Sequence, residues 1–258
     1  MYIHETHSTS SLLHELYEEK LPHMFTIRTD YQTAGRGQAG NSWESEKGKN
    51  LLFSTLLRYP QVEASEQWRL SMLVAVAVRE AIVEAMKQKG DEAKGEGIQI
   101  KWPNDIYYED KKVVGILIEN TLSGRNIAYT IAGIGINVNQ TEWLSNAPNP
   151  LSIKQITGKE YNIEEILEYF VAAIQKWEGE TTETIREAYI KHLYRRKGWH
   201  SYIEREVSLA PTHIIGKAEC EGAFEAEWAD ITAQGEWVLR LRNGEEKKYH
   251  FKQVRFVI

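Results

Sequence analysis

A short glycine-rich loop holds the densest group of residues that could bind an anion. It spans residues 34–43 and reads Ala-Gly-Arg-Gly-Gln-Ala-Gly-Asn-Ser-Trp. Glycines can adopt positive φ and leave backbone N–H groups uncovered, and successive uncovered amides bind anions. Arg36 adds a guanidinium group suited to phosphate or carboxylate, and Trp43 is flat and large enough to cover a purine. An ordinary glycine-rich hairpin with an exposed arginine would look the same, so the loop alone does not decide its function.

A second polar cluster interrupts a segment of strand-like composition. Residues 101–105 read Lys-Trp-Pro-Asn-Asp, and because proline cannot donate to a sheet, the chain must bulge or leave the sheet there. Lys101, Asn104 and Asp105 are therefore gathered at one break, although Asn and Asp after proline also favour simple turns. Lys112 follows a polar hairpin tip and begins the next apolar run. We expect the hairpin to bring Lys112 beside Asp105, against the alternative of a solvent-exposed lysine.

Four consecutive hydroxyl side chains precede the first helical pattern. Residues 8–11 read Ser-Thr-Ser-Ser, and Leu12, Leu13 and Leu16 follow at helical spacing. One hydroxyl is expected to cap this helix, and capping by itself would explain the cluster. Because a cap needs only one residue, the other hydroxyls could still point at a ligand.

A near-continuous apolar run over residues 127–138 is typical of a strand buried on both faces. Gly133 and Gly135 would weaken such a strand unless something approaches its backbone closely. Asn137 places an amide at the end of the run, where it is either a satisfied core group or a reader of a base edge.

The remaining patterns predict an α+β fold. Apolar residues at helical spacing and an Asn cap predict helices over residues 70–86, 162–177 and 182–195. Beyond Gly198 the sequence changes to short β-like runs separated by turns, and Asn243-Gly244 is a strong hairpin signal. We expect two domains, residues 1–202 and a small β-barrel over residues 203–258.

Composition excludes several classes of function. Lys and Arg number 31 against 37 Asp and Glu, and this net charge of −6 argues against a nucleic-acid binder. The basic stretch 194–197 is more simply explained as a helix end. Cys220 is the single cysteine, so an intramolecular disulfide and a multi-cysteine metal site are excluded. The N-terminus has no apolar leader and no segment approaches a membrane span, so we expect a cytoplasmic protein.

Together these segments resemble the biotin protein ligases, whose catalytic domain is related to class II aminoacyl-tRNA synthetases. The resemblance covers nearly the whole chain and rests on motifs that follow the family's order. They are Ser8-Thr9-Ser10, Tyr31-Gln32 with Ala34-Gly35-Arg36-Gly37 through Trp43, Lys101-Trp102-Pro103-Asn104-Asp105, Lys112 with Gly115-Ile116-Leu117, and Gly133-Ile134-Gly135-Ile136-Asn137. It implies a mixed β-sheet with flanking helices in the catalytic domain, followed by a small C-terminal SH3-like β-barrel.

The resemblance also implies an ATP-dependent, amide-forming biotin–[acetyl-CoA-carboxylase] ligase. Biotin's carboxylate would attack the α-phosphate of ATP to give biotinyl-5′-AMP and pyrophosphate. A lysine of a biotin carboxyl carrier protein or domain would then take the biotinyl group. Mg²⁺ would accompany ATP, with its protein ligands unassigned, and no permanently bound cofactor is implied.

The family's motifs assign roles to residues of this chain. Catalytic roles fall to Lys112, Arg36, Asp105 and Lys101, with Asp105 orienting or deprotonating the incoming amine. Biotin binding falls to Ser8, Thr9, Ser10, Gln32, Gly35, Arg36, Gly37, Lys112, Gly115 and Gly133. ATP or adenylate binding falls to Arg36, Gln38, Trp43, Lys101, Asn104 and Asn137.

Three departures from the family pattern affect these expectations. Basic residues are frequent in the family where this chain has Gln38, Ala39 and Asn41, so the loop is expected to hold the adenylate differently. Ser10 stands where Asn is frequent and reaches less far. Because the first motif starts at Ser8, we expect a monofunctional ligase without the DNA-binding domain of some bacterial relatives, and no DNA partner.

Two rival functions and the oligomeric state stay open. A lipoate or octanoyl protein ligase would share the scaffold, but relatives of that kind typically have a different glycine motif. A biotin-binding protein without catalysis would not need Lys101, Asp105 and Lys112. An exposed sheet edge could pair two subunits into a homodimer, although no motif requires it.

Overall fold

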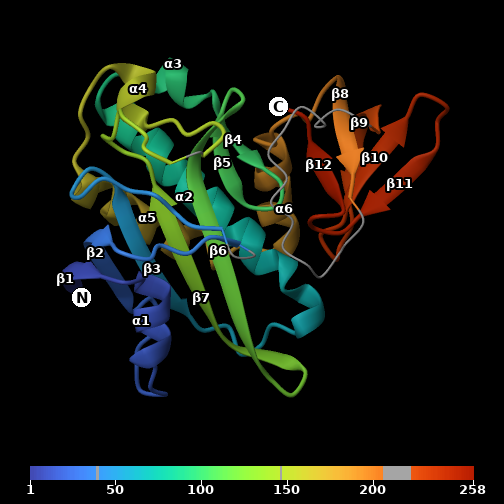
Figure 1. Cartoon of the computed structure of the whole chain (residues 1–258). Helices are drawn as coiled ribbons and strands as arrows, with labels where there is room; N and C mark the ends of the chain where they lie inside the picture. Colours follow the sequence, from blue (N-terminus) through green and yellow to red (C-terminus); the bar gives the residue numbers. More distant parts are fainter. Residues whose placement is uncertain (39–40, 146, 206–221) are drawn as a thin grey trace. The chain divides into compact units, whose positions relative to one another are not determined.

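A computed structural model describes residues 1–38, 41–145, 147–205 and 222–258 (Figure 1). The chain divides into two compact units, Met1–His192 and Leu193–Ile258. The division falls before strand β8 (Trp199–Glu204), which pairs with β9 (Ala223–Ile231) and β12 (Val254–Phe256), whereas the sequence had suggested a boundary after residue 202. None of the described helices is long and apolar enough to cross a membrane.

The first unit is built on a mixed seven-stranded sheet. In spatial order its strands are β1 (Tyr2–Thr6), β2 (Thr26–Gln32), β3 (Leu51–Leu57), β7 (Asn126–Ile136), β6 (Lys111–Ser123), β5 (Asp105–Tyr108) and β4 (Ile98–Lys101). Only β1 and β2 are parallel, and every other neighbouring pair is antiparallel. The mixed sheet predicted for this part of the chain is therefore confirmed.

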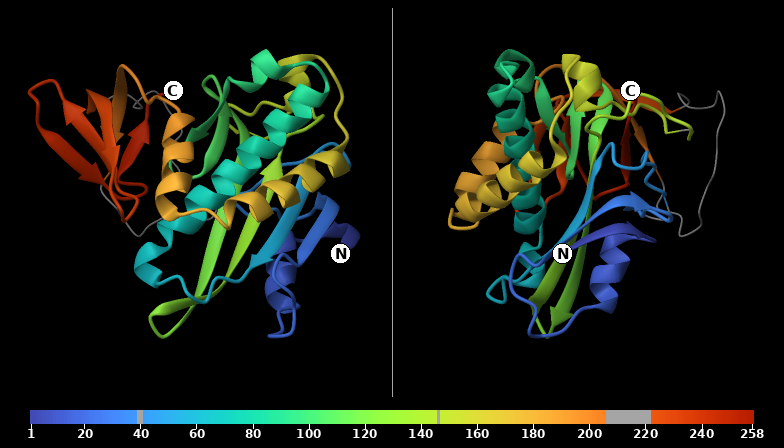
Figure 2. Two further views of the ribbon diagram at one scale, coloured as in Figure 1. Left: turned by 180° about the vertical axis from the view of Figure 1, so that it is seen from behind. Right: turned by 90° about the vertical axis from the view of Figure 1, so that its left-hand side faces the viewer.

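Helices cover the two faces of this sheet unequally. Helices α2 (Trp68–Gln88), α5 (Ile163–Trp177) and α6 (Thr182–Lys191) lie on one face, and α1 (Thr9–Glu15) lies on the other (Figure 2). Short helical turns complete the unit: η2 (Ala64–Glu66), α3 (Glu92–Gly95) and α4 (Ile153–Thr157). All seven residues of β3 are buried, which agrees with a strand packed on both sides.

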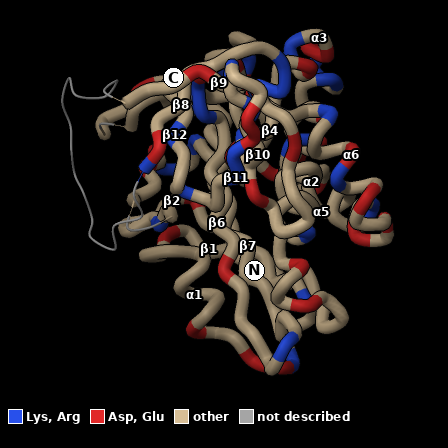
Figure 3. Tube along the Cα trace, turned by 90° about the vertical axis from the view of Figure 1, so that its right-hand side faces the viewer, with Lys and Arg blue, Asp and Glu red and all other residues tan. Residues whose placement is uncertain are grey.

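The helix predictions hold with one correction. Helices α2 and α5 match the expected segments, whereas α6 ends at Lys191 instead of continuing to residue 195. The C-cap residue His192 has φ −109° and ψ 19°, which are outside the helical region, and Arg195 further along has a positive φ of 56°. Acidic and basic residues are interspersed along the helices of this unit (Figure 3).

Helix α1 seals one end of its sheet face. Its Leu13 packs into a buried cluster with Ile27, Leu56 and Ile131 from strands β2, β3 and β7. The Ser8 hydroxyl caps the helix by accepting the Ser11 N–H, which confirms that one residue of the hydroxyl cluster is the cap. The rest of this sheet face, beyond the helix, is left for the glycine-rich loop.

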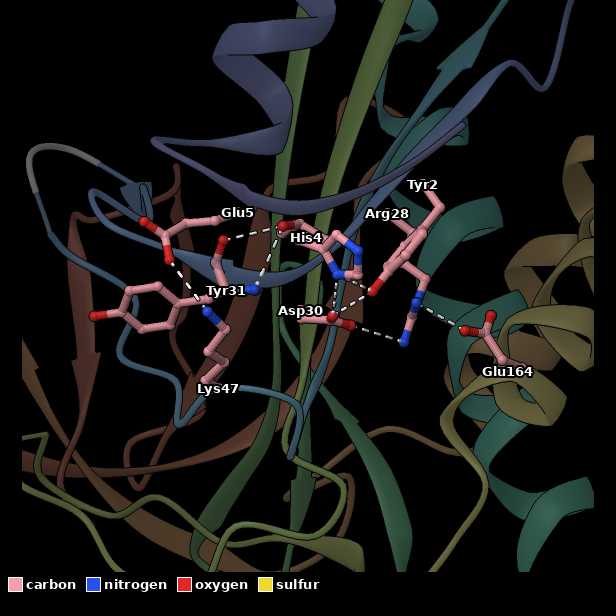
Figure 4. A network of polar contacts seen from close by, with 9 residues as sticks. Tyr2, His4, Glu5, Arg28, Asp30, Tyr31, Lys47 and Glu164 are labelled. Carbon is pink, nitrogen blue, oxygen red and sulfur yellow. Dashed lines mark hydrogen bonds and ion pairs between the residues drawn. The ribbon is translucent and has the colours of Figure 1, made fainter.

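Polar contacts fix β2, the strand that leads into the glycine-rich loop (Figure 4). Arg28 Nη1 lies 2.8 Å from the Glu164 carboxylate at the start of α5, and Arg28 Nη2 lies 3.4 Å from Asp30. Asp30 also accepts a hydrogen bond from the Tyr2 hydroxyl of β1. Side chains of β1, β2 and α5 are thereby tied together at this edge.

The second unit is a five-stranded antiparallel sheet. Its order is β11 (Glu246–Tyr249), β10 (Trp237–Leu241), β9, β8 and β12. The hairpin predicted at Asn243-Gly244 joins β10 to β11, and Gly244 takes the positive φ of 85° that favours glycine. Among the described residues β11 and β12 are edge strands, so the SH3-like region is an antiparallel sheet that does not close into a barrel.

Candidate active site

A cluster of buried hydroxyls and one amide forms where α1 meets β2 and β3. The Gln32 side-chain oxygen accepts the Thr9 N–H at 2.8 Å and lies 3.2 Å from the Thr9 hydroxyl. The Thr9 hydroxyl is also 2.8 Å from the Ser54 hydroxyl, and the Ser8 and Ser10 hydroxyls are 3.2 Å apart. Such a cluster presents several small donors and acceptors in one place.

Ser54 was not predicted from the sequence. It is fully buried in β3, where its register partner is Gly133 of β7. An ideal Cβ on Gly133 would lie 3.4 Å from the Ser10 hydroxyl and 3.5 Å from the Ser54 hydroxyl. The available signal was a hydroxyl within the apolar strand 51–57, but only the sheet register connects it to Thr9.

Two glycines beside this cluster form a flat surface under an indole ring. Gly115 of β6 and Gly135 of β7 are register partners. An ideal Cβ would lie 2.6 Å from Trp43 Cζ3 at Gly115 and 2.5 Å from Trp43 Nε1 at Gly135, so side chains there would collide with the ring. The expectation that something approaches the strand backbone closely is confirmed at Gly135, and the approaching group is Trp43.

Close approach also explains the described glycines of the glycine-rich loop. A Cβ at Gly35 would lie 2.5 Å from the Trp43 carbonyl oxygen, and neither Gly35 nor Gly37 has positive φ. The expected reliance on positive φ is therefore wrong for these two, and Gly40 lies outside the described residues. The Gly37 N–H donates to the Asn41 carbonyl at 2.7 Å, and the Trp43 N–H donates to the Gly35 carbonyl at 2.9 Å.

The loop positions that differ from the family pattern include Gln38 and Ala39. Gln38 contributes its carbonyl oxygen to the Asn41 N–H at 3.2 Å. Ala39, one of the positions that departs from the family pattern, lies outside the described residues.

Arg36 is ion-paired in this structure. Its Nη2 lies 2.5 Å from Glu119 Oε1 of β6, and its Nη1 donates to the Ser11 hydroxyl of α1 at 3.2 Å. The other carboxylate oxygen of Glu119 is 3.6 Å from His14 Nε2. The contacts of Arg36 with Glu119 and Ser11, and of Glu119 with His14, were not predicted from the sequence, because they join segments far apart in the chain.

Lys112 and Asp105 meet as expected. Lys112 Nζ lies 2.8 Å from Asp105 Oδ2 and 5.7 Å from the centroid of a Trp43 ring. Lys101 is the register partner of Asp105 across the β4–β5 hairpin, and its Nζ lies 5.2 Å from the Tyr107 ring centroid. Asp105 of β5 is thus paired with Lys112 of β6, which lies near Trp43 of the glycine-rich loop, while Lys101 of β4 lies over Tyr107 of β5.

Two buried asparagines present unused acceptors. Asn137 Nδ2 donates to the Lys112 carbonyl at 3.3 Å, which supports a structural role for the amide group. Within the described residues, however, neither Asn137 Oδ1 nor Asn104 Oδ1 has a hydrogen-bond partner, and both side chains are buried. A buried acceptor without a partner is costly, so both oxygens are suited to a ligand donor or a water molecule.

Glu44 connects the end of the glycine-rich loop to residues 143–145. Its carboxylate accepts the N–H groups of Leu144 at 2.7 Å and Ser145 at 2.8 Å. Burial by itself would raise the pKa of Glu44, but these bonds and one from the Ser145 side chain hold the pKa below its usual value. The carboxylate therefore stays ionised and keeps the two segments together.

The arrangement is suited to binding an anion beside a small neutral polar group. Lys112 lies near the indole and Gly115, Arg36 lies at the start of the glycine-rich loop against Glu119 and Ser11, and the hydroxyl cluster adjoins Gly133. In the part of the chain that the structure describes, no group of three or more His, Cys, Asp or Glu side chains could hold a metal ion.

Comparisons with known proteins agree on one family. Residues 2–137 match the model of the biotin/lipoate A/B protein ligase family. The chain is 34% identical over 174 residues to the bifunctional ligase/repressor BirA of Bacillus subtilis, an alignment that covers 66% of this chain and 50% of that protein. It is 32% identical over 221 residues to the biotin–[acetyl-CoA-carboxylase] ligase of Paracoccus denitrificans, covering 81% of each chain.

A solved structure shows the same fold. The biotin protein ligase of Aquifex aeolicus in complex with biotin and ATP superimposes with a TM-score of 0.72 at 23% identity, covering 100% of this chain and 98% of that one. The chain thus spans about half the length of the first curated relative and nearly all of this structural neighbour.

Proposed function

Because the chain belongs to the biotin/lipoate A/B protein ligase family, we propose that it activates biotin with ATP and transfers the biotinyl group to a lysine. The acceptor lysine belongs to a biotin carboxyl carrier domain. The observation that carries this proposal is the Lys112–Asp105 ion pair beside Trp43, on a glycine surface that leads to the buried hydroxyl cluster. The name of the Paracoccus relative supports biotin as the acid.

The hydroxyl cluster is assigned to the ureido end of biotin. That end is neutral, with two N–H donors and one carbonyl acceptor, and it needs small polar partners within a closed space. Ser8, Thr9, Gln32 and Ser54 supply such groups, and all but Gln32 are buried. The apolar tail would then run along Gly133 toward the Gly115–Gly135 pair, where the strands have no side chains.

Lys112 is assigned to the reacting carboxylate and phosphate. In the first step a carboxylate oxygen bonds to the α-phosphorus of ATP, and pyrophosphate leaves with the electron pair of the broken P–O bond. Negative charge grows on the phosphate oxygens, and a fixed ammonium group stabilises it. Asp105 holds Lys112 Nζ at 2.8 Å, which orients this ammonium group before substrate arrives.

Asp105 is also assigned to the second step, the transfer of the biotinyl group. The carrier lysine must be neutral to attack the biotinyl carbonyl, and a carboxylate within reach can orient its amine and accept a proton. The new amide bond forms as AMP leaves. The carboxylate of Asp105 is about one quarter exposed, so an incoming side chain can reach it.

ATP is assigned to the side of the site formed by Trp43, Asn104 and Asn137. The unused Asn137 Oδ1 and Asn104 Oδ1 are acceptors, and the exocyclic amino group of adenine is a donor. Trp43 offers a ring face for the base. Mg²⁺ would arrive with ATP and neutralise phosphate oxygens, so the site does not need a metal cluster of its own.

Mass spectrometry of a carrier domain tests this proposal. The purified chain is incubated with ATP, Mg²⁺, biotin and a biotin carboxyl carrier domain, with lipoate and octanoate in parallel reactions. The proposal predicts that the carrier gains one biotinyl group only in the reaction with biotin and ATP. Modification by lipoate or octanoate would instead place the chain among the other acyl ligases of the family, and binding of biotin without any transfer would indicate a non-catalytic protein.

A further inference from the structure

Arg36 is held from two directions by side chains that are distant in the sequence. Glu119 of β6 contacts Nη2 at 2.5 Å, and Ser11 of α1 accepts from Nη1 at 3.2 Å. The Arg36 side chain is 42% exposed, whereas that of Glu119 is 25% exposed. The guanidinium group is therefore fixed at the border between α1 and the glycine-rich loop.

The position of Glu119 follows from the alternation of β6. Gly115, Leu117 and Glu119 lie on the same face of the strand, because side chains alternate along it. This is the face on which Trp43 lies over Gly115. The register partner of Glu119 is Ile131, which belongs to the buried cluster under α1.

Glu119 is consequently a carboxylate at the edge of an apolar cluster. In the described residues its Oε2 is buried without a hydrogen-bond partner, and His14 Nε2 lies 3.6 Å from it. A partly buried carboxylate is costly unless a cation compensates it. A carboxylate that only formed a surface ion pair would not need to lie at the edge of an apolar cluster. A carboxylate that fixes Arg36 would need this position.

Arg36 in turn positions Trp43 through the backbone of the loop. Arg36 and Ser42 form an antiparallel bridge, and the Trp43 N–H donates to the Gly35 carbonyl. Holding the Arg36 side chain therefore holds both strands of this small hairpin. The indole ring lies over the Gly115–Gly135 pair at the end of the same hairpin.

We propose that Glu119 is a positioning residue for the adenylation step. Its ion pair with Arg36 anchors the glycine-rich loop to β6 and keeps Trp43 over the Gly115–Gly135 pair. The inference rests on the proposed function for its catalytic consequence. Its structural part, the anchoring of the loop, is independent of which acid is activated.

Hydrogen exchange and a double-mutant cycle test the proposal together. Glu119→Gln, Arg36→Ala and the double variant are compared in the full chain, with Glu160→Gln as the matched control, since Glu160 pairs with Lys154 at 2.8 Å on an exposed surface. The N–H groups of Gly37 and Trp43, which donate within the loop, report its order. Biotin-dependent pyrophosphate exchange reports catalysis, with kcat and the KM for ATP measured separately.

The proposal predicts faster exchange of both amides in Glu119→Gln and Arg36→Ala, with no change in the control. It also predicts a loss of about tenfold in kcat/KM for ATP in each single variant, because a loosened loop no longer keeps Trp43 over the glycine pair. The double variant should lose no more than the worse single variant, because Glu119 acts through Arg36.

Two results would overturn the proposal. One is unchanged protection of both amides in Glu119→Gln, and the other is a double variant whose loss is the product of the two single losses. If Glu119→Gln does not fold, Ser11→Ala serves instead, because it removes the second contact to Arg36 without leaving a buried charge. Hydrogen exchange of the same two amides should then be faster, but by less than in Glu119→Gln. If the unaltered chain shows no pyrophosphate exchange, the proposed function fails. Hydrogen exchange would still show whether Glu119 anchors the glycine-rich loop.

Discussion

Lys112 is held by its backbone as well as by its side chain. Its N–H donates to the Asn149 carbonyl at 2.7 Å, and its carbonyl accepts from the Leu151 N–H at 2.9 Å and from Asn137. These contacts fix the backbone from which the side chain extends, and the ion pair with Asp105 holds Nζ itself. A fixed cation of this kind stabilises charge that grows during a reaction better than a mobile one, because it does not reorganise.

Lys112→Ala should therefore reduce catalysis far more than binding. We expect biotin-dependent pyrophosphate exchange to fall by roughly a hundredfold, the size of effect seen when one stabilising group of a transition state is removed. Biotin affinity, measured by calorimetry, should change only a few-fold, since the residues proposed to hold the ureido end do not include Lys112. Lys112→Arg should keep part of the activity. If pyrophosphate exchange were unaltered in Lys112→Ala, Lys112 would not have the role assigned to it.

Strands β6 and β7 bring the separate motifs together at the scale of elements. Their register places Gly115 opposite Gly135 and Leu117 opposite Gly133, so three of these four neighbouring positions on one sheet face carry no side chain. Trp43 covers one part of this surface, and Ser10 approaches the other at Gly133. Neither the glycine-rich loop nor the strands would form this surface alone.

Gly135→Ala should displace the indole and reduce activity. The new Cβ would lie 2.5 Å from Trp43 Nε1, so the ring or the strand must shift. We expect the KM for ATP to rise about tenfold, which corresponds to about 1.4 kcal/mol of lost interaction. Gly179→Ala is the control, because its Cβ would meet no atom closer than 3.9 Å. Equal KM values for the two variants would contradict the assigned position of Trp43.

Local sequence patterns predicted the elements better than the contacts between them. The helices α2 and α5, the Ser8–Ser11 cap, the 243–244 hairpin and the Lys112–Asp105 pair all depend on residues close together in the chain or on one hairpin. The Arg36–Glu119 pair spans 83 positions, and it exists only because the register of β6 points Glu119 toward α1. Positive φ does not explain Gly35 and Gly37; the backbone of Trp43 passes close to Gly35 and Asn41 lies against Gly37, contacts that only the folded chain shows.

At the scale of the whole molecule, the stability of the first unit should depend on pH through the end of α6. Burial, followed by the charges of Arg79 and Lys191, lowers the pKa of His192 from 6.5 to about 4. Burial also lowers the pKa of Arg79 to about 10, and Arg79 Nε donates to the Ile98 carbonyl at 2.7 Å. His192 thus stays neutral in the folded chain, at a position where its carbonyl accepts the Ile100 N–H of β4.

Stability should fall as the pH decreases from about 6.5 to about 4. In that range the unfolded chain binds a proton at His192 and the folded chain does not, so protonation favours unfolding. Above pH 6.5 this contribution is fully present. His192→Asn should flatten the pH dependence of the urea midpoint in this range. The same slope in His192→Asn as in the unaltered chain would refute this.

The most direct test of the central claim is exchange of labelled pyrophosphate into ATP in the presence of biotin, lipoate or octanoate. This exchange requires the acyl-adenylate to form and to revert, so it isolates the first step from the carrier protein. Our account predicts exchange with biotin alone, and its loss in Lys112→Ala. Exchange supported by lipoate or octanoate but not by biotin, or by none of the three acids, would contradict the account.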